Sequence, residues 1–523
     1  MVAPRRHAVT LIIITILVLF TIILWKHPSG LLPVLSHQPS PNMSITHIVM
    51  FQFKDGVSPE VIKDVCSRML ALKDNCIHPT SQKPYIQAAS GGLDNSPEGI
   101  QHCQYLTLMS QDRMWLRDDH SLFTMVEVQT LVQPDIQYHP DYTKYTARTE
   151  RRIATETLPK TLPKRFPEHL DSPLVWEGTE VEKRDDWIYQ LNDGQLDEID
   201  QALQFFKSKN PSLGSINQST FPLPTLHPIL RDLSREIHLG RGFVVVRGLR
   251  IDHYTREDNI IIYAGVSSHI GNYRGRQEDN RIKGTPSRVL SHIKDISNKV
   301  QPGTIGAPSN TADKQVFHTD SGDIISLLCL QEAAEGGESK LASSWHVYNI
   351  LARERPDLIH TLTQDWPFDG FSNPTQPYST RPLLYHQPAT SNTPERVLIQ
   401  YARRYFTGFM AQPRSTNIPP ISEAQAEALD ALHFLAEKHS ASLGFQKGDI
   451  QYVNNLSIFH ARNGFTDGPG KERHLLRLWL RDPEYAWETP EPLRKRWDSL
   501  YKDLEPEEQD FPLEPRIRGN TTS

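Results

Sequence analysis

The chain has 523 residues, of which 38% are hydrophobic and 23% charged, an ordinary globular balance that suggests roughly two to four domains. The net charge is −6 and no basic cluster runs through the chain, which makes nucleic acid an unexpected partner. The four cysteines form no C-x-x-C pair and are too few for a disulfide scaffold, so neither a cysteine-bound zinc nor a dithiol redox centre is indicated.

The amino terminus carries an apolar stretch. Residues 8–25 (AVTLIIITILVLFTIILW) contain no charged side chain, and their number is near the minimum for a helix that spans a bilayer. Arginines precede the stretch, and Trp25 stands where an interfacial aromatic residue is typical. We therefore predict a single-pass membrane anchor within residues 1–27, and a membrane location. The alternatives are a cleaved signal peptide and translation from Met43, which would give a cytoplasmic protein.

A small domain is predicted over residues 44–146, after a Pro- and Ser-rich linker at 28–43. It opens with THIVMFQF, which has the β-branched and aromatic content of a strand. Ser58-Pro59-Glu60 then has the residues that begin a helix. With His139-Pro140-Asp141-Tyr142 at its end, this order resembles the stress-responsive dimeric α/β-barrel family. The resemblance implies a small ferredoxin-like α+β fold.

One part of the small domain departs from that family. Residues 101–135 show neither the clean strand nor the helix that the resemblance implies. We interpret the domain as a dimerisation or docking module without chemistry of its own. A homodimer formed through it is therefore a candidate assembly.

A larger domain is predicted over residues 173–502, after a charged, Pro-rich linker at 147–172. An amphipathic helix is expected at 226–239 and a longer helix at 422–443, which Ser422 and Gln425 begin as a capping box. Many short strands lie between and after these helices, and such strands separated by turn residues are typical of a sandwich or jelly roll. The expected strands are residues 243–247, 315–317, 323–330, 396–402, 449–453 and 474–481. The acidic, Pro-rich tail, residues 503–523, is predicted to be disordered.

Three H-x-D pairs raise the question of an iron site. Two histidines and one carboxylate on one face of a metal leave open positions for a co-substrate and O2. An H-x-D pair on a strand suits this task, because residues i and i+2 point to the same side. The pairs at 139–141 and 169–171 lie in the small domain and a linker. Only His318 and Asp320 stand between two strand-like runs, so we predict that they bind the metal.

The third predicted metal ligand is His460, in GDIQYVNNLSIFHAR. Arg473 follows it by 13 residues and Arg477 by 17. A guanidinium at this point can bind a carboxylate bidentately. The two arginines are four residues apart and share a face of a strand. Either can bind the co-substrate, while the other faces the substrate or a structural acid.

These motifs resemble taurine dioxygenase and its relatives over about residues 173–495. The resemblance implies a double-stranded β-helix, mainly β with flanking helices. It implies that His318, Asp320 and His460 bind Fe(II) and that Arg473 holds 2-oxoglutarate. Ser339 matches a threonine that helps to hold the co-substrate in that family. The motifs that carry the resemblance are GRGFVVVRGL, QVFHTDSGD, AAEGGESKLASS, GDIQYVNNLSIFHAR and RHLLRLWLRD.

The predicted activity is an Fe(II)-, 2-oxoglutarate- and O2-dependent dioxygenation. It would oxidise an aliphatic C–H bond of a small organic molecule, by hydroxylation or desaturation, and release succinate and CO2. No side chain beyond the metal ligands is required as an acid or base. If Arg477 faces the substrate, a sulfonate or carboxylate is expected; a neutral metabolite is the alternative. A membrane-anchored scaffold with an inactive dioxygenase fold is the rival of another class. Candidate substrate-binding residues are Asn272, Tyr273, Asn454 and Arg404.

Overall fold

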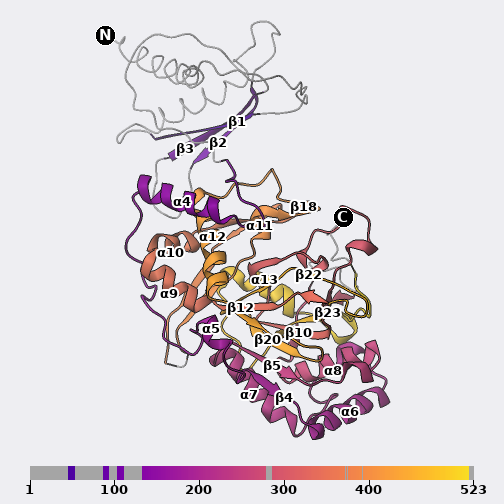
Figure 1. The fold of residues 1–523 in the computed structure, drawn as a ribbon. Helices are drawn as coiled ribbons and strands as arrows, with labels where there is room; N and C mark the ends of the chain where they lie inside the picture. Colours follow the sequence, from indigo (N-terminus) through magenta and orange to yellow (C-terminus); the bar gives the residue numbers. More distant parts are fainter. Residues whose placement is uncertain are drawn as a thin grey trace, which may run out of the picture. The chain divides into compact units, whose positions relative to one another are not determined.

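The computed structural model of the chain divides into two compact units, residues 1–128 and 129–523 (Figure 1). In the first unit, the structure describes the backbone of residues 45–52, 86–93 and 103–110, which form three strands. The described residues of the second unit are 132–277, 286–371, 373, 375–391 and 393–516.

The first unit contains an antiparallel sheet of three strands in the order β1-β3-β2. β1 (Ile45–Gln52) confirms the strand predicted at the start of the small domain. β2 is Ile86–Leu93 and β3 is Cys103–Ser110, which pairs with both neighbours. The expectation that residues 101–135 contain no clean strand was therefore wrong for the first part of this stretch. The predicted helix after Ser58 lies outside the described residues.

The predicted anchor, residues 8–25, also lies outside the described residues. Within the residues that the structure does describe, no helix is both long and apolar enough to cross a membrane. The anchor and the membrane location stay predictions.

Two β-sheets packed face to face form the centre of the second unit. The larger sheet has the order β4-β5-β20-β10-β23-β6, with β8 also paired to β23, and the smaller has the order β19-β12-β21-β9. The strands of the larger sheet are β4 Ile188–Gln190, β5 Phe243–Arg247, β6 Tyr273–Arg274, β8 Leu290–Ile293, β10 Ile324–Gln331, β20 Ile450–Asn454 and β23 His474–Arg481. Those of the smaller sheet are β9 Gln315–His318, β12 Ser339–Ser343, β19 Ala441–Leu443 and β21 Ile458–Arg462.

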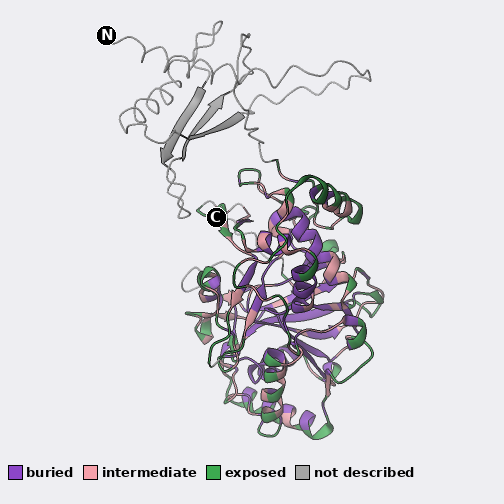
Figure 2. Ribbon diagram, turned by 90° about the vertical axis from the view of Figure 1, so that its left-hand side faces the viewer, coloured by how far each residue is buried: buried purple, intermediate pink, exposed green. Residues whose placement is uncertain are grey.

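The space between the sheets is filled by alternate residues of their strands. Phe243 and Val245 of β5 pack with Leu341 of β12 and Ile458 of β21 in one buried cluster. Because side chains alternate along a strand, the intervening residues, such as Val244, point to the opposite face. Burial is accordingly concentrated on the central strands (Figure 2).

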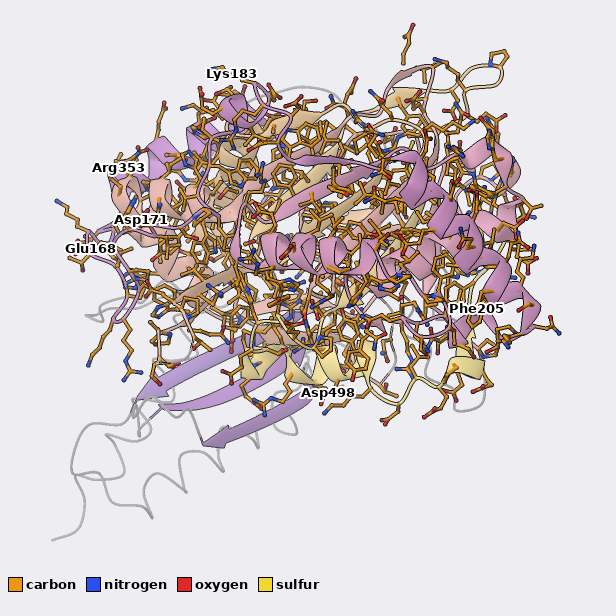
Figure 3. All side chains as sticks on the ribbon, turned by 90° about the horizontal axis from the view of Figure 1, so that it is seen from below. Glu168, Asp171, Lys183, Phe205, Arg353 and Asp498 are labelled. Carbon is orange, nitrogen blue, oxygen red and sulfur yellow. The ribbon has the colours of Figure 1, made fainter. Side chains whose placement is uncertain are left out.

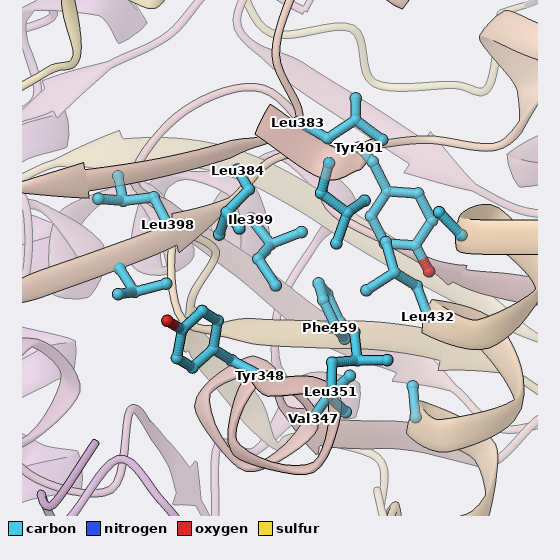
Figure 4. Packing of buried hydrophobic residues seen from close by; sticks show 14 of the residues in the cluster. Val347, Tyr348, Leu351, Leu383, Leu384, Leu398, Ile399, Tyr401, Leu432 and Phe459 are labelled. Atoms are coloured by element: carbon cyan, nitrogen blue, oxygen red, sulfur yellow. The ribbon is translucent and has the colours of Figure 1, made fainter. Parts of the chain in front are cut away.

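Helices cover the outer faces of both sheets (Figure 1). On the larger sheet, α6, α7 and α8 bury their apolar residues against even-numbered residues of β23 such as Leu476 and Leu478. On the smaller sheet, α9, α10 and α12 pack with Phe317, Phe459 and neighbouring aromatic residues, as Figure 4 shows around Phe459. The mainly β prediction with flanking helices is confirmed at this level. The helices are α6 Asp193–Ser208, α7 Leu226–Leu239, α8 Arg256–Ser268, α9 Ser344–Glu354, α10 Pro356–Thr363 and α12 Glu423–Lys438.

The capping box predicted for α12 is present, since the Ser422 side chain accepts from the Gln425 backbone N–H and the Gln425 side chain accepts from the Ser422 backbone. The predicted end at residue 443 was wrong. The helix ends at Lys438, and residues 441–443 form β19, which pairs with β12. Here the requirement for an edge strand on the smaller sheet overrides the apolar periodicity that continued past Lys438.

Residues 142–155 form a helix, α4 (Tyr142–Thr155), where the small domain was expected to end and a linker to begin. Asp141 caps it, so the HPDY motif belongs to the second unit. Two buried arginines of α4 bind acidic residues of α12: Arg148 lies 2.6 Å from Asp430, and Arg152 pairs with Glu427. These buried ion pairs make α4 part of the larger unit.

We expect Arg152→Ala to lower the free energy of unfolding by about 2 kcal/mol, the value of a hydrogen bond to a buried charged group. The loss stays moderate because Glu427 keeps its bonds to Arg355 and Thr149. Urea unfolding followed by circular dichroism measures it, with the exposed Arg151→Ala as the matched control. Equal stability of the two variants would mean that α4 is not anchored through Arg152.

The tail is ordered as far as residue 516, contrary to the predicted disorder from residue 503. After α13 (Glu491–Tyr501), β24 (Gln509–Asp510) pairs in parallel with β7 (Ser287–Arg288). Phe511 is buried among the helices that cover the larger sheet. This single aromatic anchor and the strand pairing stabilise a segment whose composition is that of a disordered chain. The short remaining pairs are β11 Glu335–Gly336 with β22 Phe465–Thr466, β13 Trp366–Asp369 with β14 Tyr378–Arg381, β15 Leu384–Gln387 with β16 Arg396–Ile399, and β17 Gly408–Phe409 with β18 Gln412–Pro413.

Candidate metal centre

His318 and His460 are brought together by the register of two neighbouring strands. β9 and β21 are antiparallel, and His318 stands directly opposite His460 in the ladder. Opposite residues of a ladder point to the same face, so the two imidazole rings lie side by side with centroids 4.2 Å apart. Asp320 follows two residues after His318, and its carboxylate lies 3.8 Å from His318 Nε2. One ligand atom from each of the three residues can be chosen so that all lie within 4.8 Å of one another.

Two side chains of β23 donate hydrogen bonds to the Asp320 carboxylate. Its Oδ2 accepts hydrogen bonds from Arg477 Nη1 at 2.8 Å and from Trp479 Nε1 at 3.1 Å. Asn455 fixes the backbone of the same turn, because it accepts from the Asp320 N–H and donates to the Asp320 carbonyl. Oδ1 therefore faces the histidines while Oδ2 is fixed by its partners, the arrangement that outer partners give to metal-binding carboxylates.

Both histidines are in the form that a metal requires. Burial lowers the pKa of His318, and burial together with neighbouring His318 lowers the pKa of His460 to about 3. Neutral imidazole is the form that ligates a metal. His318 Nδ1 lies 2.8 Å from the Val316 carbonyl, which makes Nδ1 the protonated nitrogen and leaves Nε2 with its lone pair toward Asp320.

The three residues line a cavity between the two sheets that is rich in buried nitrogen atoms. Several of these atoms have no hydrogen-bond partner, namely Arg473 Nη1, Gln451 Nε2, His460 Nδ1, and Nε and Nη1 of Arg462. Buried polar atoms without partners are rare in proteins because each costs free energy. Their convergence fits a bound metal with an anionic, multidentate ligand beside it.

Arg473 is a cation of the cavity that can bind an anion. It is buried, and burial lowers its pKa to about 10, so it stays protonated at neutral pH. No ion pair joins it to a carboxylate of any described residue, and its side chain donates only to the Gly337 carbonyl, through Nε at 3.3 Å. Gly337 permits this approach: its φ is +79°, and a Cβ there would lie 2.8 Å from Arg473 Nε. Ser339, on the adjoining strand, donates to Gln451 Oε1 at 3.0 Å and lines the same cavity.

Arg477 of β23 lines the same cavity as Arg473, which directly precedes this strand, but Arg477 faces an acid. Its guanidinium binds Asp320 and also Gln277 Oε1 at 2.9 Å. Of the two alternatives for this residue, a structural acid fits these contacts better than a substrate anion.

The predicted substrate-binding residues are not brought together. Asn272 and Tyr273 are exposed and line neither cavity beside His318. Asn454 is buried, and its side chain bonds to backbone groups of Ile237 and Leu456, a structural role. Arg404 alone lines a second cavity, beside His318 and Asp320, where its guanidinium also lies over the Phe371 ring.

The other two H-x-D pairs have no such surroundings. His139 and Asp141 are exposed, and Asp141 caps α4. His169 and Asp171 are exposed on an irregular segment, where Figure 3 places Asp171 at the periphery.

The cavity residues that were missed from the sequence include Arg462, Gln451, Trp479 and Tyr138. Arg462 and Gln451 could have been found, because each stands on a strand at an even spacing from a cavity residue, two after His460 and two before Val453. Trp479 follows Arg477 by two residues on β23 and could have been found by the same spacing. Tyr138 had no local signal, since it reaches the second cavity from a segment without regular structure.

Comparisons with known proteins identify both parts of the chain. Residues 208–479 match the taurine catabolism dioxygenase TauD, TfdA family. Residues 45–131 match the stress responsive A/B barrel domain. The second match ends before Tyr138, in agreement with the placement of the HPDY motif in the larger unit.

Two curated proteins are similar over most of their own length. The taurine hydroxylase-like protein SAT17 of Stachybotrys chartarum is 38% identical over 66% of this chain and 89% of its own. The FR-33289 synthase of Streptomyces rubellomurinus is 26% identical over 58% of this chain and 88% of its own.

Among solved structures, asparagine oxygenase in complex with Fe(II), hydroxyasparagine and succinate aligns at 14% identity and a TM-score of 0.43, covering 56% of this chain and 93% of that one. The non-haem iron oxygenase OrfP in complex with Fe and α-ketoglutaric acid aligns at 14% identity and a TM-score of 0.41, covering 56% of this chain and 94% of that one.

Proposed function

Because the chain belongs to the taurine catabolism dioxygenase TauD, TfdA family, and is thus a 2-oxoglutarate-dependent non-haem iron oxygenase that uses Fe(II), we propose that it oxidises an aliphatic C–H bond of a small organic substrate, by hydroxylation or desaturation. We propose His318, Asp320 and His460 as the iron ligands. The observation that carries this assignment is the convergence of the three ligand atoms within 4.8 Å beside a cavity of unpartnered nitrogen donors. The double-stranded β-helix is our proposal for the topology, supported by β9, β10 and β12, and later β20, β21 and β23, which alternate between the two sheets.

The bound iron and 2-oxoglutarate supply the oxidising chemistry, in which O2 converts 2-oxoglutarate to succinate and CO2 and oxidises the substrate. The protein's contribution is position. Arg477 and Trp479 hold the Asp320 carboxylate so that one oxygen faces the metal. Arg473, with Ser339 and Gln451 lining the same cavity, would hold the far carboxylate of 2-oxoglutarate, beside the proposed ligands His318 and His460. No side chain is needed to move a proton at the substrate carbon.

The substrate enters, in this proposal, through the second cavity, which shares His318 and Asp320 with the first. Its lining mixes polar and apolar residues and includes three arginines and three aromatic residues, among them Arg404, Tyr405, Trp479 and Tyr138. Such a lining favours a polar or anionic small molecule. Because Arg477 is bound to Asp320, Arg404 is the better candidate for a substrate anion.

The test is anaerobic addition of Fe(II) and 2-oxoglutarate to the full-length protein, followed by visible spectroscopy for the weak charge-transfer band of the chelate. The band, and succinate formation after O2 is admitted, are the expected results. A folded, iron-loaded protein that gives neither would support the alternative of an inactive scaffold. Small molecules that accelerate succinate formation then define the substrate class.

The indole of Trp479 is expected to raise iron affinity through Asp320. Trp479→Phe removes one hydrogen bond to the carboxylate and keeps most of the ring volume. We expect iron affinity to fall about 10-fold, the lower end of the range for outer partners of metal ligands. Trp345→Phe is the matched control, because its indole donates to the Val397 carbonyl in the core away from the metal. Equal iron affinity in both variants would contradict the positioning role.

Tyr138 is expected to shape substrate choice. Its ring packs edge-to-face on Phe409 and lines the cavity beside Asp320. Tyr138→Ala should change kcat/KM for a stimulating substrate by about 10-fold or more, because lost pocket contacts act on the substrate alone. The KM for 2-oxoglutarate should not change. Tyr142→Ala, at an exposed position of α4, is the control. An equal response of the two variants would show that Tyr138 does not touch the substrate.

A further inference from the structure

A second group of two histidines and one carboxylate lies outside both cavities. Its members are Glu177, His346 and His439, and one ligand atom from each can be chosen so that all lie within 4.8 Å of one another. They come from three segments: Glu177 precedes α5 (Gly178–Val181), His346 lies in the first turn of α9, and His439 caps the end of α12. None of these residues has a part in the proposed oxygenase chemistry.

The backbones that carry Glu177 and His439 are locked together. The Gly178 N–H donates to the His439 carbonyl at 3.1 Å. A Cβ on Gly178 would lie 2.1 Å from the Ser440 carbonyl carbon, so only glycine permits this approach. The first turn of α9 is joined to the same region, because Ser343 accepts from the His346 N–H and donates to the Leu174 carbonyl. Main-chain contacts therefore hold the three segments that carry these side chains close together.

The side-chain geometry differs from that of a simple hydrogen-bonded cluster. His439 Nδ1 is 2.6 Å from Glu177 Oε2 and bonded to it. His346 Nε2 lies 3.3 Å from the same oxygen, yet it is buried and makes no hydrogen bond. Two imidazoles that served only to bind the carboxylate would both be aligned with it. Instead, Nε2 of His346 makes no hydrogen bond, although it lies within 4.8 Å of a ligand atom of both Glu177 and His439.

We propose that Glu177, His346 and His439 bind a Zn²⁺ ion that clamps α5, α9 and α12. Nitrogen and carboxylate ligands suit zinc, which binds them at about 2.1 Å and so places them roughly 3.4 Å apart in a tetrahedron. The separation of 3.3 Å between His346 and Glu177 fits this, and the contact of 2.6 Å to His439 must open. The side chains are 17–31% exposed, so water can complete the fourth position.

The test is zinc binding by untagged full-length protein, stripped with a chelator and titrated with Zn²⁺ alone against a chromophoric competitor. The iron triad also takes zinc, so the titration is done in the His318→Ala/His460→Ala double variant, which leaves only Asp320 there. One equivalent of tightly bound Zn²⁺ is expected in this background. Adding Glu177→Gln, which preserves side-chain shape, should weaken it by more than about 100-fold, since even outer partners of a metal ligand are worth about 10- to 100-fold.

His386→Ala is the matched control, because His386 pairs with Glu395 at 2.8 Å without a second histidine. In the double-variant background, this change should leave the zinc equivalent intact. Zn²⁺ should also raise the thermal midpoint of that background but not after Glu177→Gln is added. No tight zinc in the double variant, or zinc retained after Glu177→Gln, would overturn the proposal. Neither outcome depends on oxygenase activity.

Discussion

We expect His460→Ala to abolish succinate formation and the charge-transfer band while the protein stays folded. His460 supplies one of three proposed iron ligands, and no other described histidine stands beside His318 and Asp320 to replace it. Loss of a ligand should lower iron affinity by more than about 100-fold, because partners that only support ligands are already worth about 10- to 100-fold. The measurement is Fe(II) binding under anaerobic conditions, with succinate formation as the second readout.

His386→Ala is the control for this experiment as well, since it removes an imidazole bonded to Glu395 and not part of either cavity. It should keep full iron affinity. If His460→Ala bound iron as tightly as this control, the metal would not be held by the proposed triad, and the remaining H-x-D pairs at 139–141 and 169–171 would have to be tested in turn.

The contrast between the triad and Tyr138 shows what the sequence could predict. His318 and Asp320 carry a local signal, because the i, i+2 spacing on a strand directs both side chains to one face. His460 was found from its own strand and from the arginines after it. Tyr138 lies in a segment whose position depends on distant contacts, such as the bond from Arg403 Nε to the Gln137 carbonyl. No periodicity encodes a contact of that kind.

The partner of Arg477 illustrates a second limit. The four-residue spacing predicted Arg473 and Arg477 on one face of a strand and left open which of them binds an anion from outside. Which arginine is occupied depends on where the Asp320 carboxylate lies relative to β23. Asn455 sets this position through its hydrogen bonds to the turn at Asp320 and Gly322. The cluster of Glu177, His346 and His439 was missed for the same reason, because its members are separated by more than 90 residues each and meet only through the packing of α5, α9 and α12.

The end of α12 and the ordered tail were missed because tertiary contacts override local preference. Apolar periodicity continued to Leu443, yet β12 needs a partner at its free edge, and residues 441–443 provide it. The tail has the composition of a disordered segment, but Phe511 is buried in the same hydrophobic cluster as Leu330 and Leu476. Composition describes the average segment and does not identify a single anchoring residue.

Arg473→Ala should raise the KM for 2-oxoglutarate by about 30-fold to several thousand-fold. Removing one partner of a buried charge pair costs about 2–5 kcal/mol, and each 1.4 kcal/mol is a factor of ten. The KM of Arg473→Lys should lie between those of the unaltered protein and Arg473→Ala, because lysine keeps the charge and loses the planar fork. Iron affinity without 2-oxoglutarate should not change, since Arg473 contacts none of the three proposed ligands.

Stability distinguishes this role from a structural one. No described carboxylate pairs with Arg473, and Nη1 is buried without a partner, so the free protein keeps an uncompensated cation in its interior. Removing such a group should leave the thermal midpoint unchanged or raise it. A large loss of stability would show that Arg473 is a structural residue. If Arg473→Ala changed neither the KM for 2-oxoglutarate nor the stability, Arg462 would be the residue that binds the co-substrate carboxylate. Its Nε and Nη1 are also unpartnered in the same cavity. Arg462→Ala would then raise the KM for 2-oxoglutarate.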